Sequence, residues 1–217
     1  LMELLGDAVK NEEPVGGTGA HEEEHDHDHD HDHDHDHEDE KDEHVWLSLR
    51  NAMTVCRAVA EELSALDPKS KNRYENNLLS YTESLRRLDT EYREAVAAGK
   101  RKTLLFADRF PFRYLVDDYG LTYYAAFSGC SAETEASFET VTFLAGKVDE
   151  LDLPCVLTIE GSDHRIAETV VQNTKAKNQQ ILTMDSLQGT TSKDVADGAG
   201  YLSLMRKNLE VLKAALR

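Results

Sequence analysis

The sequence lacks the features that mark several common classes of protein. No apolar run comes near the length of about 20 residues that a membrane-spanning helix needs. The three cysteines, Cys56, Cys130 and Cys155, form no C-x-x-C pair; we expect the first and last to be buried and Cys130 to lie in a loop. There is no basic patch, so nucleic acid is not expected as a partner. The motifs of serine hydrolases, P-loop enzymes, dinucleotide-binding enzymes and HExxH metalloproteases are absent, so no class of enzyme gains support.

Acidic charge is concentrated in one segment of the chain. The 217 residues carry a formal net charge of −18, and 14 carboxylates with one lysine give residues 21–43 a net charge of −13. The remainder carries only about −5, which is ordinary for the surface of a globular protein. Because 40% of all residues are hydrophobic, we expect a sizeable core outside this segment.

The acidic segment also holds most of the histidines. Residues 21–40 read HEEEHDHDHDHDHDHDHEDE and contain eight of the ten histidines in the chain. Imidazole is the commonest protein ligand of Zn, Ni and Cu ions, and a purely solvating acidic segment would not need it. We therefore expect residues 11–43 to be disordered without ligand and to bind several metal ions loosely. The accessory ligands would be His25, His27, His29, His31, His33, His35 and His37.

Hydrophobic periodicity predicts two helices, followed by an alternation of strands and helices. A helix capped by Ser48 or its neighbour should run to about Leu66, and a second over residues 71–98 would be roughly 40 Å long, long enough for a strut between two lobes. Strands are then expected at 102–107, 121–127, 154–160 and 179–185, and helices at 111–120, 137–152, 164–174 and 200–216. This order predicts an α/β fold with a parallel sheet covered by helices on both faces.

Polar residues follow each predicted strand, at the edge where ligands bind in open α/β sheets. In chain order they are Asp108 and Arg109, then Cys130, Glu133 and Glu135, then Glu160, Ser162, Asp163 and His164, and finally Asp185 and Ser186. One further histidine, His44, stands alone beside Val45 and Trp46. These residues are the candidates for a binding site.

Each candidate also has a purely structural interpretation. Asp185 follows the run ILTM, where a turn or a helix cap commonly begins, and Asp108 would pair with its neighbour Arg109. A lone histidine such as His44 is more often structural than a metal ligand. The contiguous Ser-Asp-His at 162–164 is not a catalytic triad, because the members of a triad come from distant positions in the sequence.

Several motifs taken together resemble one protein family. DEHVWLSLRNA follows the histidine-rich segment, the long helix ends in LDTEYREAV, and RFPFRYLVDDYGL and ILTMDSL…GYLSLMRKNLEVLKAAL come after it. The chain is similar, over essentially its whole length, to the solute-binding proteins of zinc and manganese ABC importers, in the zinc-type branch with a histidine-rich loop. The resemblance implies two α/β lobes joined by one long helix, with the metal in the cleft between them.

The resemblance also implies how the chain is divided. Residues 1–66 would end an N-terminal lobe, residues 67–99 would form the connecting helix, and residues 100–217 would form a complete C-terminal lobe. The sequence opens with LMELLGDAVKN and has no initiator Met. We therefore expect an N-terminally truncated fragment whose missing part includes most of the first lobe and the export signal.

Carried over position by position, two of the family's metal ligands fall on His44, in the D-x-H-x-W motif, and on Asp185, after the last strand. The third position departs from the family, because Arg109 stands where His or Glu is usual and a guanidinium group does not ligate cations. Asp108 is the expected substitute. Further candidates are Cys130 and Glu160. Histidine and carboxylate ligands, together with the histidine-rich segment, favour Zn²⁺ over Mn²⁺.

The function implied by the resemblance is binding, not catalysis. The protein would be an extracytoplasmic monomer that captures zinc and delivers it to an ABC permease, meeting the membrane only through that permease or a lipid anchor. Two alternatives are a metal buffer or chaperone that uses the histidine-rich segment, and a manganese-type solute-binding protein. A third alternative, a metal-dependent hydrolase, would need an open coordination position on the metal and a nearby general base.

Overall fold

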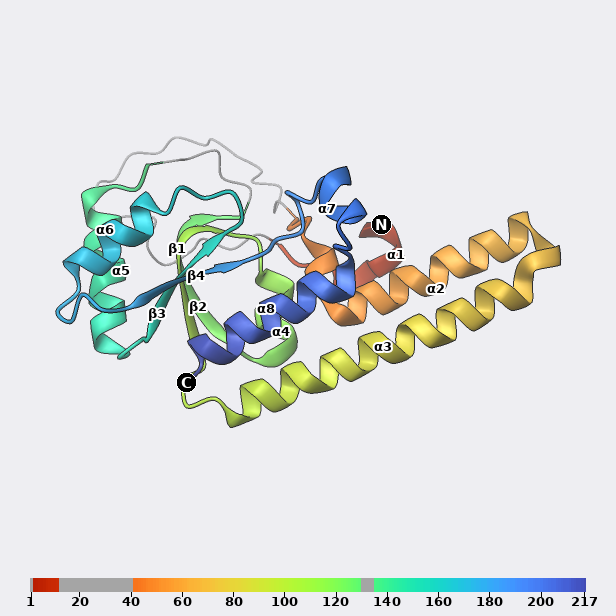
Figure 1. Ribbon diagram of the computed structural model, residues 1–217, viewed down its shortest axis with the longest axis horizontal. Coiled ribbons are helices and arrows are strands. Elements are labelled where there is room, and N and C mark those ends of the chain that lie inside the picture. The colour runs from red at the N-terminus through yellow and green to blue at the C-terminus, as the bar shows by residue number, and fades with distance from the viewer. Residues whose placement is uncertain (1, 12–40, 130–134) are drawn as a thin grey trace, which may run out of the picture.

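The computed structural model describes residues 2–11, 41–129 and 135–217 (Figure 1). Within these ranges the predicted fold class is confirmed, because a four-stranded parallel sheet is combined with one long helix. The accessory histidines from His25 to His37, together with Cys130 and Glu133, lie outside the described residues. Their roles in metal binding therefore stay predictions.

The chain that precedes the sheet is helical. Its elements are α1 Met2–Leu5, the 3₁₀ turns η1 Gly6–Ala8 and η2 Val45–Leu47, α2 Leu49–Leu66, the 3₁₀ turn η3 Pro68–Ser70, and α3 Lys71–Ala98. Both predicted helices are confirmed. The hydroxyl oxygen of Ser48 accepts the backbone N–H of Asn51 at 3.1 Å, so Ser48 caps α2 as expected.

α2 and α3 form a helical hairpin that extends beyond the sheet (Figure 1). Only the second half of α3 enters the core, where Leu85, Leu88 and Tyr92 are fully buried. The hydroxyl of Tyr92 donates to the carbonyl oxygen of Met205 at 2.6 Å. Leu79, in the first half of α3, is instead 65% exposed. The helix therefore fixes one end of the hairpin to the sheet and leaves the other end projecting.

Four parallel strands follow, in the spatial order β2-β1-β3-β4. The strands are β1 Thr103–Phe110, β2 Thr122–Ser128, β3 Cys155–Ile159 and β4 Gln180–Met184; the helices among and after them are α4 Arg113–Tyr119, α5 Phe138–Glu150, α6 Arg165–Asn173, α7 Ser192–Ala196 and α8 Tyr201–Ala215. The order of the strands reverses between β1 and β3, which makes the carboxyl ends of these two strands the expected place for a ligand. Sequence periodicity does not predict α1 or α7, because both are too short to show a hydrophobic period.

Helices cover both faces of the sheet, as predicted, and each face has its own core. α5 and α6 cover one face, where Leu144 and Val148 pack in a cluster with Val156 of β3. α3, α4 and α8 contribute to the core on the other face, and this core also includes Leu47 and Leu49. The segment around His44 is thereby packed directly against the unit formed by residues 100–217.

The two pieces of chain that flank residues 12–40 lie against each other. Asn11 and Lys41 form an antiparallel β-bridge, and the backbone N–H of Asp42 donates to the carbonyl oxygen of Lys10 at 2.9 Å. The expected disorder over residues 11–43 is therefore wrong at its two ends, which these backbone hydrogen bonds hold in place.

The two described cysteines differ in their surroundings. Cys155 is buried in β3, as predicted, and burial raises the pKa of its thiol to about 12. Cys56 on α2 is only partly buried, so the prediction of a buried residue is wrong there. The cause is the hairpin, because α2 packs mainly against α3 and leaves part of its circumference open.

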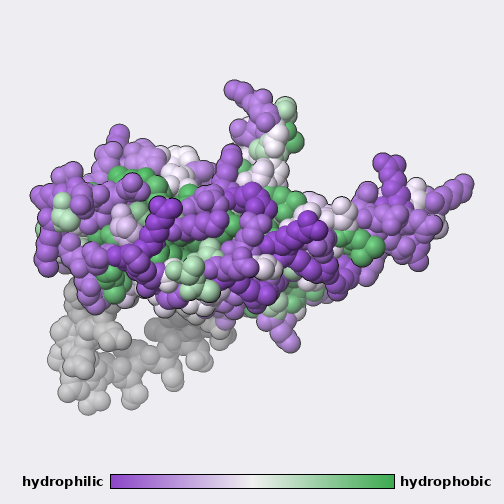
Figure 2. Space-filling model, turned by 60° about the horizontal axis from the view of Figure 1, so that its bottom comes forward, coloured by the Kyte–Doolittle hydropathy of each residue, from purple (hydrophilic) through white to green (hydrophobic). Residues whose placement is uncertain are grey.

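In the described parts of the chain, no helix is both long and apolar enough to cross a membrane. The face of the molecule in Figure 2 is mostly hydrophilic, with apolar side chains gathered in small, separate areas.

Candidate metal-binding site

His44 lies at the carboxyl edge of the sheet and is 1% exposed. A Cβ atom at Gly129, which follows β2, would stand 3.1 Å from Cε1 of His44 and 3.0 Å from the carbonyl oxygen of Phe110, the last residue of β1. The ring of Trp46 closes another side, with its centroid 5.4 Å from that of His44. A side chain at position 129 would therefore crowd the imidazole, which lies directly beside the glycine.

A buried carboxylate holds the histidine. Oδ1 of Asp42 accepts hydrogen bonds from both the backbone N–H and Nδ1 of His44, each at 2.8 Å. Asp42 is itself 3% exposed. The contact occupies Nδ1 of His44, so Nε2 is the ring nitrogen that Asp42 does not hold.

The segment that contains His44 is tied to the far end of the sheet. The indole N–H of Trp46 donates to the carbonyl oxygen of Ser186 at 2.9 Å, and the hydroxyl of Tyr201 on α8 donates to the carbonyl oxygen of Trp46 at 2.6 Å. Ser186 directly follows Asp185, the carboxylate predicted as a second ligand. The contact therefore brings the sequence neighbourhoods of His44 and Asp185 to one edge of the sheet.

Asp185 begins the turn after β4. Its backbone N–H donates to Oδ1 of Asn208 at 2.8 Å, Nδ2 of Asn208 donates back to the Asp185 carbonyl at 2.7 Å, and its Oδ1 accepts the N–H of Leu187 at 2.8 Å. Burial raises the pKa of Asp185; the nearby Glu160 carboxylate raises it further, whereas the Leu187 hydrogen bond lowers it. The residue thus has a turn-forming role and a partly exposed carboxylate.

Glu160, at the end of β3, holds the same turn. Its carboxylate accepts the N–H and the hydroxyl of Ser186 at 2.7 and 2.5 Å, and the N–H of Gly189 at 3.2 Å. Arg165, five residues further along the chain, pairs with Asp163 instead, with its Nε 3.0 Å from Oδ2 of Asp163. With these three donors, Glu160 is placed as an anchor for the 185–189 turn.

Asp108 and Arg109 lie near the end of β1, where the register with β2 shifts, and their side chains differ in burial. Asp108 is 9% exposed, and its two carboxylate oxygens accept the N–H groups of Arg109 at 2.8 Å and Ile159 at 3.3 Å. The Arg109 side chain is exposed, and among the described residues no ion pair joins it to Asp108. Their predicted ion pair is therefore wrong, and Asp108 links β1 to β3.

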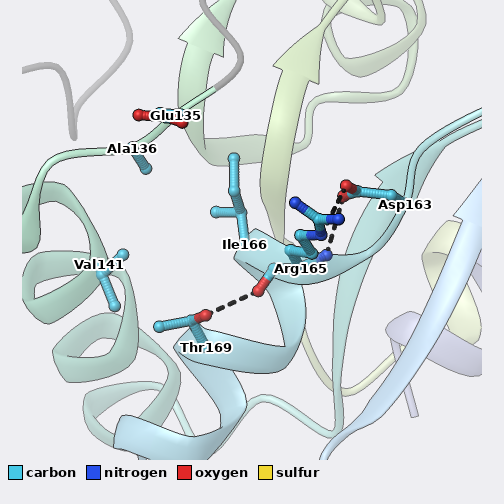
Figure 3. A pocket seen from close by; sticks show the side chains of 7 residues that line it. All are labelled: Glu135, Ala136, Val141, Asp163, Arg165, Ile166 and Thr169. Atoms are coloured by element: carbon cyan, nitrogen blue, oxygen red, sulfur yellow. Dashed lines mark hydrogen bonds and ion pairs between the residues drawn. The ribbon is translucent and has the colours of Figure 1, made fainter.

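Two hollows lie near this edge. The larger, of ≈ 440 Å³, is lined by Glu135, Ala136, Val141, Asp163, Arg165, Ile166 and Thr169, so it contains none of the three predicted ligands (Figure 3). The smaller, of ≈ 290 Å³, is lined by Asp108, Arg109, Phe127, Gly161, Ser162, Asp163 and Ile166. It lies at the switch point between β1 and β3 and contains one predicted ligand, Asp108.

The three predicted ligands occupy one edge of the sheet but do not form a single cluster. Over residues 2–11, 41–129 and 135–217, no three His, Cys, Asp or Glu side chains are close enough together to hold a metal ion. The assignment of His44, Asp185 and Asp108 as ligands therefore stays a prediction. Sequence reasoning missed the supporting contacts of Asp42, Trp46 and Glu160. Of these contacts, only that of Asp42 could have been expected from the local sequence, since an Asp side chain often accepts the backbone N–H of the residue two positions further on.

A parallel sheet flanked by helices, together with one long helix, defines an α/β fold, and His44 is buried at the carboxyl edge of its sheet. The sequence model of the family described as "ZnuA: Zinc-uptake complex component A periplasmic" matches residues 2–215. The chain belongs to this family. The predicted family is thereby confirmed.

Relatives with names and solved structures agree with this assignment. The zinc-binding lipoprotein AdcA of Streptococcus pneumoniae is 33% identical over 172 residues, which are 79% of this chain and 33% of AdcA. The crystal structure of the Zn(II)-bound ZnuA-like domain of AdcA matches with a TM-score of 0.66 and 30% identity, covering 81% of this chain and 64% of that one. The metal-dependent lipoprotein YcdH from Bacillus subtilis matches with a TM-score of 0.70 and 26% identity, covering 82% and 65%. The chain thus spans about a third of the length of AdcA.

Proposed function

We propose that the chain is part of the zinc-capturing subunit of an ABC metal importer, working outside the cytoplasmic membrane. The single observation that carries the proposal is His44, buried at the carboxyl edge of the sheet with its Nδ1 held by a carboxylate. This arrangement leaves Nε2 for a metal ion. The family match and the Zn(II)-bound relative support zinc as the cargo.

His44 and Asp185 are the proposed ligands, with Asp108 as the third. Each carboxylate oxygen has two lone pairs, so the hydrogen bonds to Asp108 and Asp185 do not prevent either residue from ligating a cation. A set of one histidine and two carboxylates suits Zn²⁺, and a set richer in oxygen would shift the preference towards Mn²⁺. The accessory histidines between residues 25 and 37 would collect metal for this site.

We also infer that a first, N-terminal lobe completes the cleft. The hairpin exposes apolar side chains along its length, which a packed partner would cover. They include Val59, Leu63, Leu66 and Leu79. In this proposal residues 1–66 end the first lobe, residues 67–99 connect the lobes, and residues 100–217 form the second. The whole protein would act as a monomer, meet an ABC permease and touch the membrane only through it or a lipid anchor.

The mechanism is binding and release, without a chemical step. Zinc would be captured when His44 is neutral, because a metal ligand must offer a lone pair, so affinity should fall in acid. Docking on the permease would then release the ion. A metal buffer that relies on residues 12–40 would have no use for a buried, carboxylate-held histidine outside that segment.

Cellular uptake of ⁶⁵Zn tests the proposal. In cells that lack the full-length gene, we expect slow uptake at low zinc concentration that is restored by the wild-type gene and not by His44→Ala. A buffer predicts unchanged uptake and lower stored zinc. Uptake of ⁵⁴Mn that depends on the gene, with unchanged ⁶⁵Zn uptake, would instead establish the manganese-type alternative.

A further inference from the structure

The contact between Asp42 and His44 combines two hydrogen bonds on one oxygen atom. Oδ1 of Asp42 lies 2.8 Å from the backbone nitrogen of His44 and 2.8 Å from its Nδ1. The first bond forms a local turn, and Asp, Asn and Ser side chains often do this. The second bond is not needed for a turn, and it is made inside a site where both residues are almost fully buried.

The ring has little freedom to escape this bond. Gly129 lies along one side of the ring, and Trp46 lies on another. Turning the ring over would remove Nδ1 from Asp42 and leave a buried carboxylate oxygen with one donor fewer, which is unfavourable at low local dielectric. The packing and the hydrogen bond thus select the same orientation of the imidazole.

Asp42 is itself fixed by groups from two other parts of the chain. The hydroxyl of Tyr114 on α4 donates to the carbonyl oxygen of Asp42 at 2.7 Å and accepts the backbone N–H of Lys10 at 3.0 Å. The backbone N–H of Asp42 donates to the carbonyl oxygen of Lys10 at 2.9 Å. Nζ of Lys10 pairs with Asp117, also on α4, at 2.8 Å. The carboxylate is therefore presented to His44 from a clamped backbone.

We propose that Asp42 is a positioning residue that holds His44 as the Nδ1–H tautomer, so that Nε2 points its lone pair at the metal ion. This role rests on the proposed function, because it concerns the same site. Carboxylates that hold the second nitrogen of a metal-binding histidine typically raise metal affinity by about 10- to 100-fold. Asp42 would act through His44 and would not touch the metal.

The first test reads the tautomer directly in metal-free protein. Long-range ¹H–¹⁵N NMR of the His44 ring, in the full-length protein, is expected to show the proton on Nδ1. The Asp42→Asn variant is expected to lose this preference, because an amide group either accepts from or donates to Nδ1. A wild-type ring protonated on Nε2 would overturn the proposal, and this result does not depend on how any variant folds.

The second test measures zinc affinity. We expect Asp42→Asn to weaken zinc binding by about 10- to 100-fold with the fold retained. Asp117→Asn is the matched control, since Asp117 lies in the same clamp and pairs with Lys10 and Arg113 without contacting His44. We expect zinc affinity within about threefold of wild type for the control. A folded Asp42→Asn variant with wild-type zinc affinity would overturn the role of Asp42. If the wild-type protein itself had no tight zinc site, the proposed function would be overturned, but the NMR result on the tautomer would still hold.

Discussion

The indole N–H of Trp46 donates to the carbonyl oxygen of Ser186 at 2.9 Å and joins segments 140 residues apart. Trp46 stands two residues after His44, and Ser186 stands one residue after Asp185. The two proposed ligands therefore come from distant parts of the chain. This contact positions them, together with one further anchoring residue beside each ligand. Those anchors are Asp42 beside His44 and Glu160 beside the 185–189 turn.

Replacing the indole tests the link between the two segments. Trp46→Phe keeps an aromatic ring beside His44 and removes the donor to Ser186. We expect zinc affinity to fall about tenfold, as is typical when a group that supports a metal ligand is lost. Isothermal titration of the full-length variant measures this. Affinity equal to that of the wild type would mean that the contact serves stability alone.

Removing the carboxylate of Glu160 should cost stability. Glu160→Ala leaves the N–H and hydroxyl of Ser186 and the N–H of Gly189 without their acceptor. Because the site is partly exposed, we expect a loss of about 1–3 kcal/mol in the free energy of unfolding. Urea denaturation of metal-free protein measures it. Glu168, exposed on α6, provides the control, and its replacement by Ala should change stability by less than about 0.5 kcal/mol.

The histidine-rich segment should be dispensable for tight binding. Asn11 and Lys41 already pair as antiparallel neighbours, so a two-residue Asn-Gly turn in place of residues 12–40 should close the chain without moving Asp42. We expect this variant to keep one tight zinc site and to lose weaker, additional binding. Titration of both proteins with zinc is the measurement. Loss of the tight site on this replacement would favour the buffer alternative.

Asp118 should make stability depend on pH in a defined direction. The hydroxyl of Ser48 donates to its Oδ2 at 2.6 Å and Arg50 lies 3.4 Å from its Oδ1, yet burial prevails and raises the pKa of Asp118. Folding therefore favours the protonated form. The stabilisation is full below the unfolded pKa, about 4, and is lost as pH rises through the higher folded value. In metal-free protein, Asp118→Asn should flatten this fall in stability between pH 4 and neutrality; an unchanged pH profile would contradict the assignment.

Local sequence patterns were sufficient for most of the fold. The spacing of Leu85, Leu88 and Tyr92 predicted α3, and the alternation of apolar runs predicted the parallel sheet. The same spacing could not show that the first half of α3 is exposed, because burial there depends on which other elements pack against it.

The site was predictable only in part. His44 and Asp185 became candidates as a lone histidine and as a carboxylate at a strand end, and the family resemblance then assigned both as ligands. The contacts that hold them were not local, since Tyr114 reaches Asp42 from 72 residues away and Glu160 reaches Ser186 from 26 residues away. Such contacts follow from tertiary packing, and a single sequence gives no pattern from which to infer them.

Zinc titration of the full-length protein with Asn-Gly in place of residues 12–40 decides whether His44 is a ligand of the tight zinc site. In this background only the proposed site at His44 should bind tightly. We predict that His44→Ala weakens binding by at least about 100-fold, because a metal ligand matters more than the groups that support it. His164→Ala, which alters a partly buried histidine at the start of α6, should leave affinity unchanged. Tight binding that survives His44→Ala would show that His44 is not a ligand of this site.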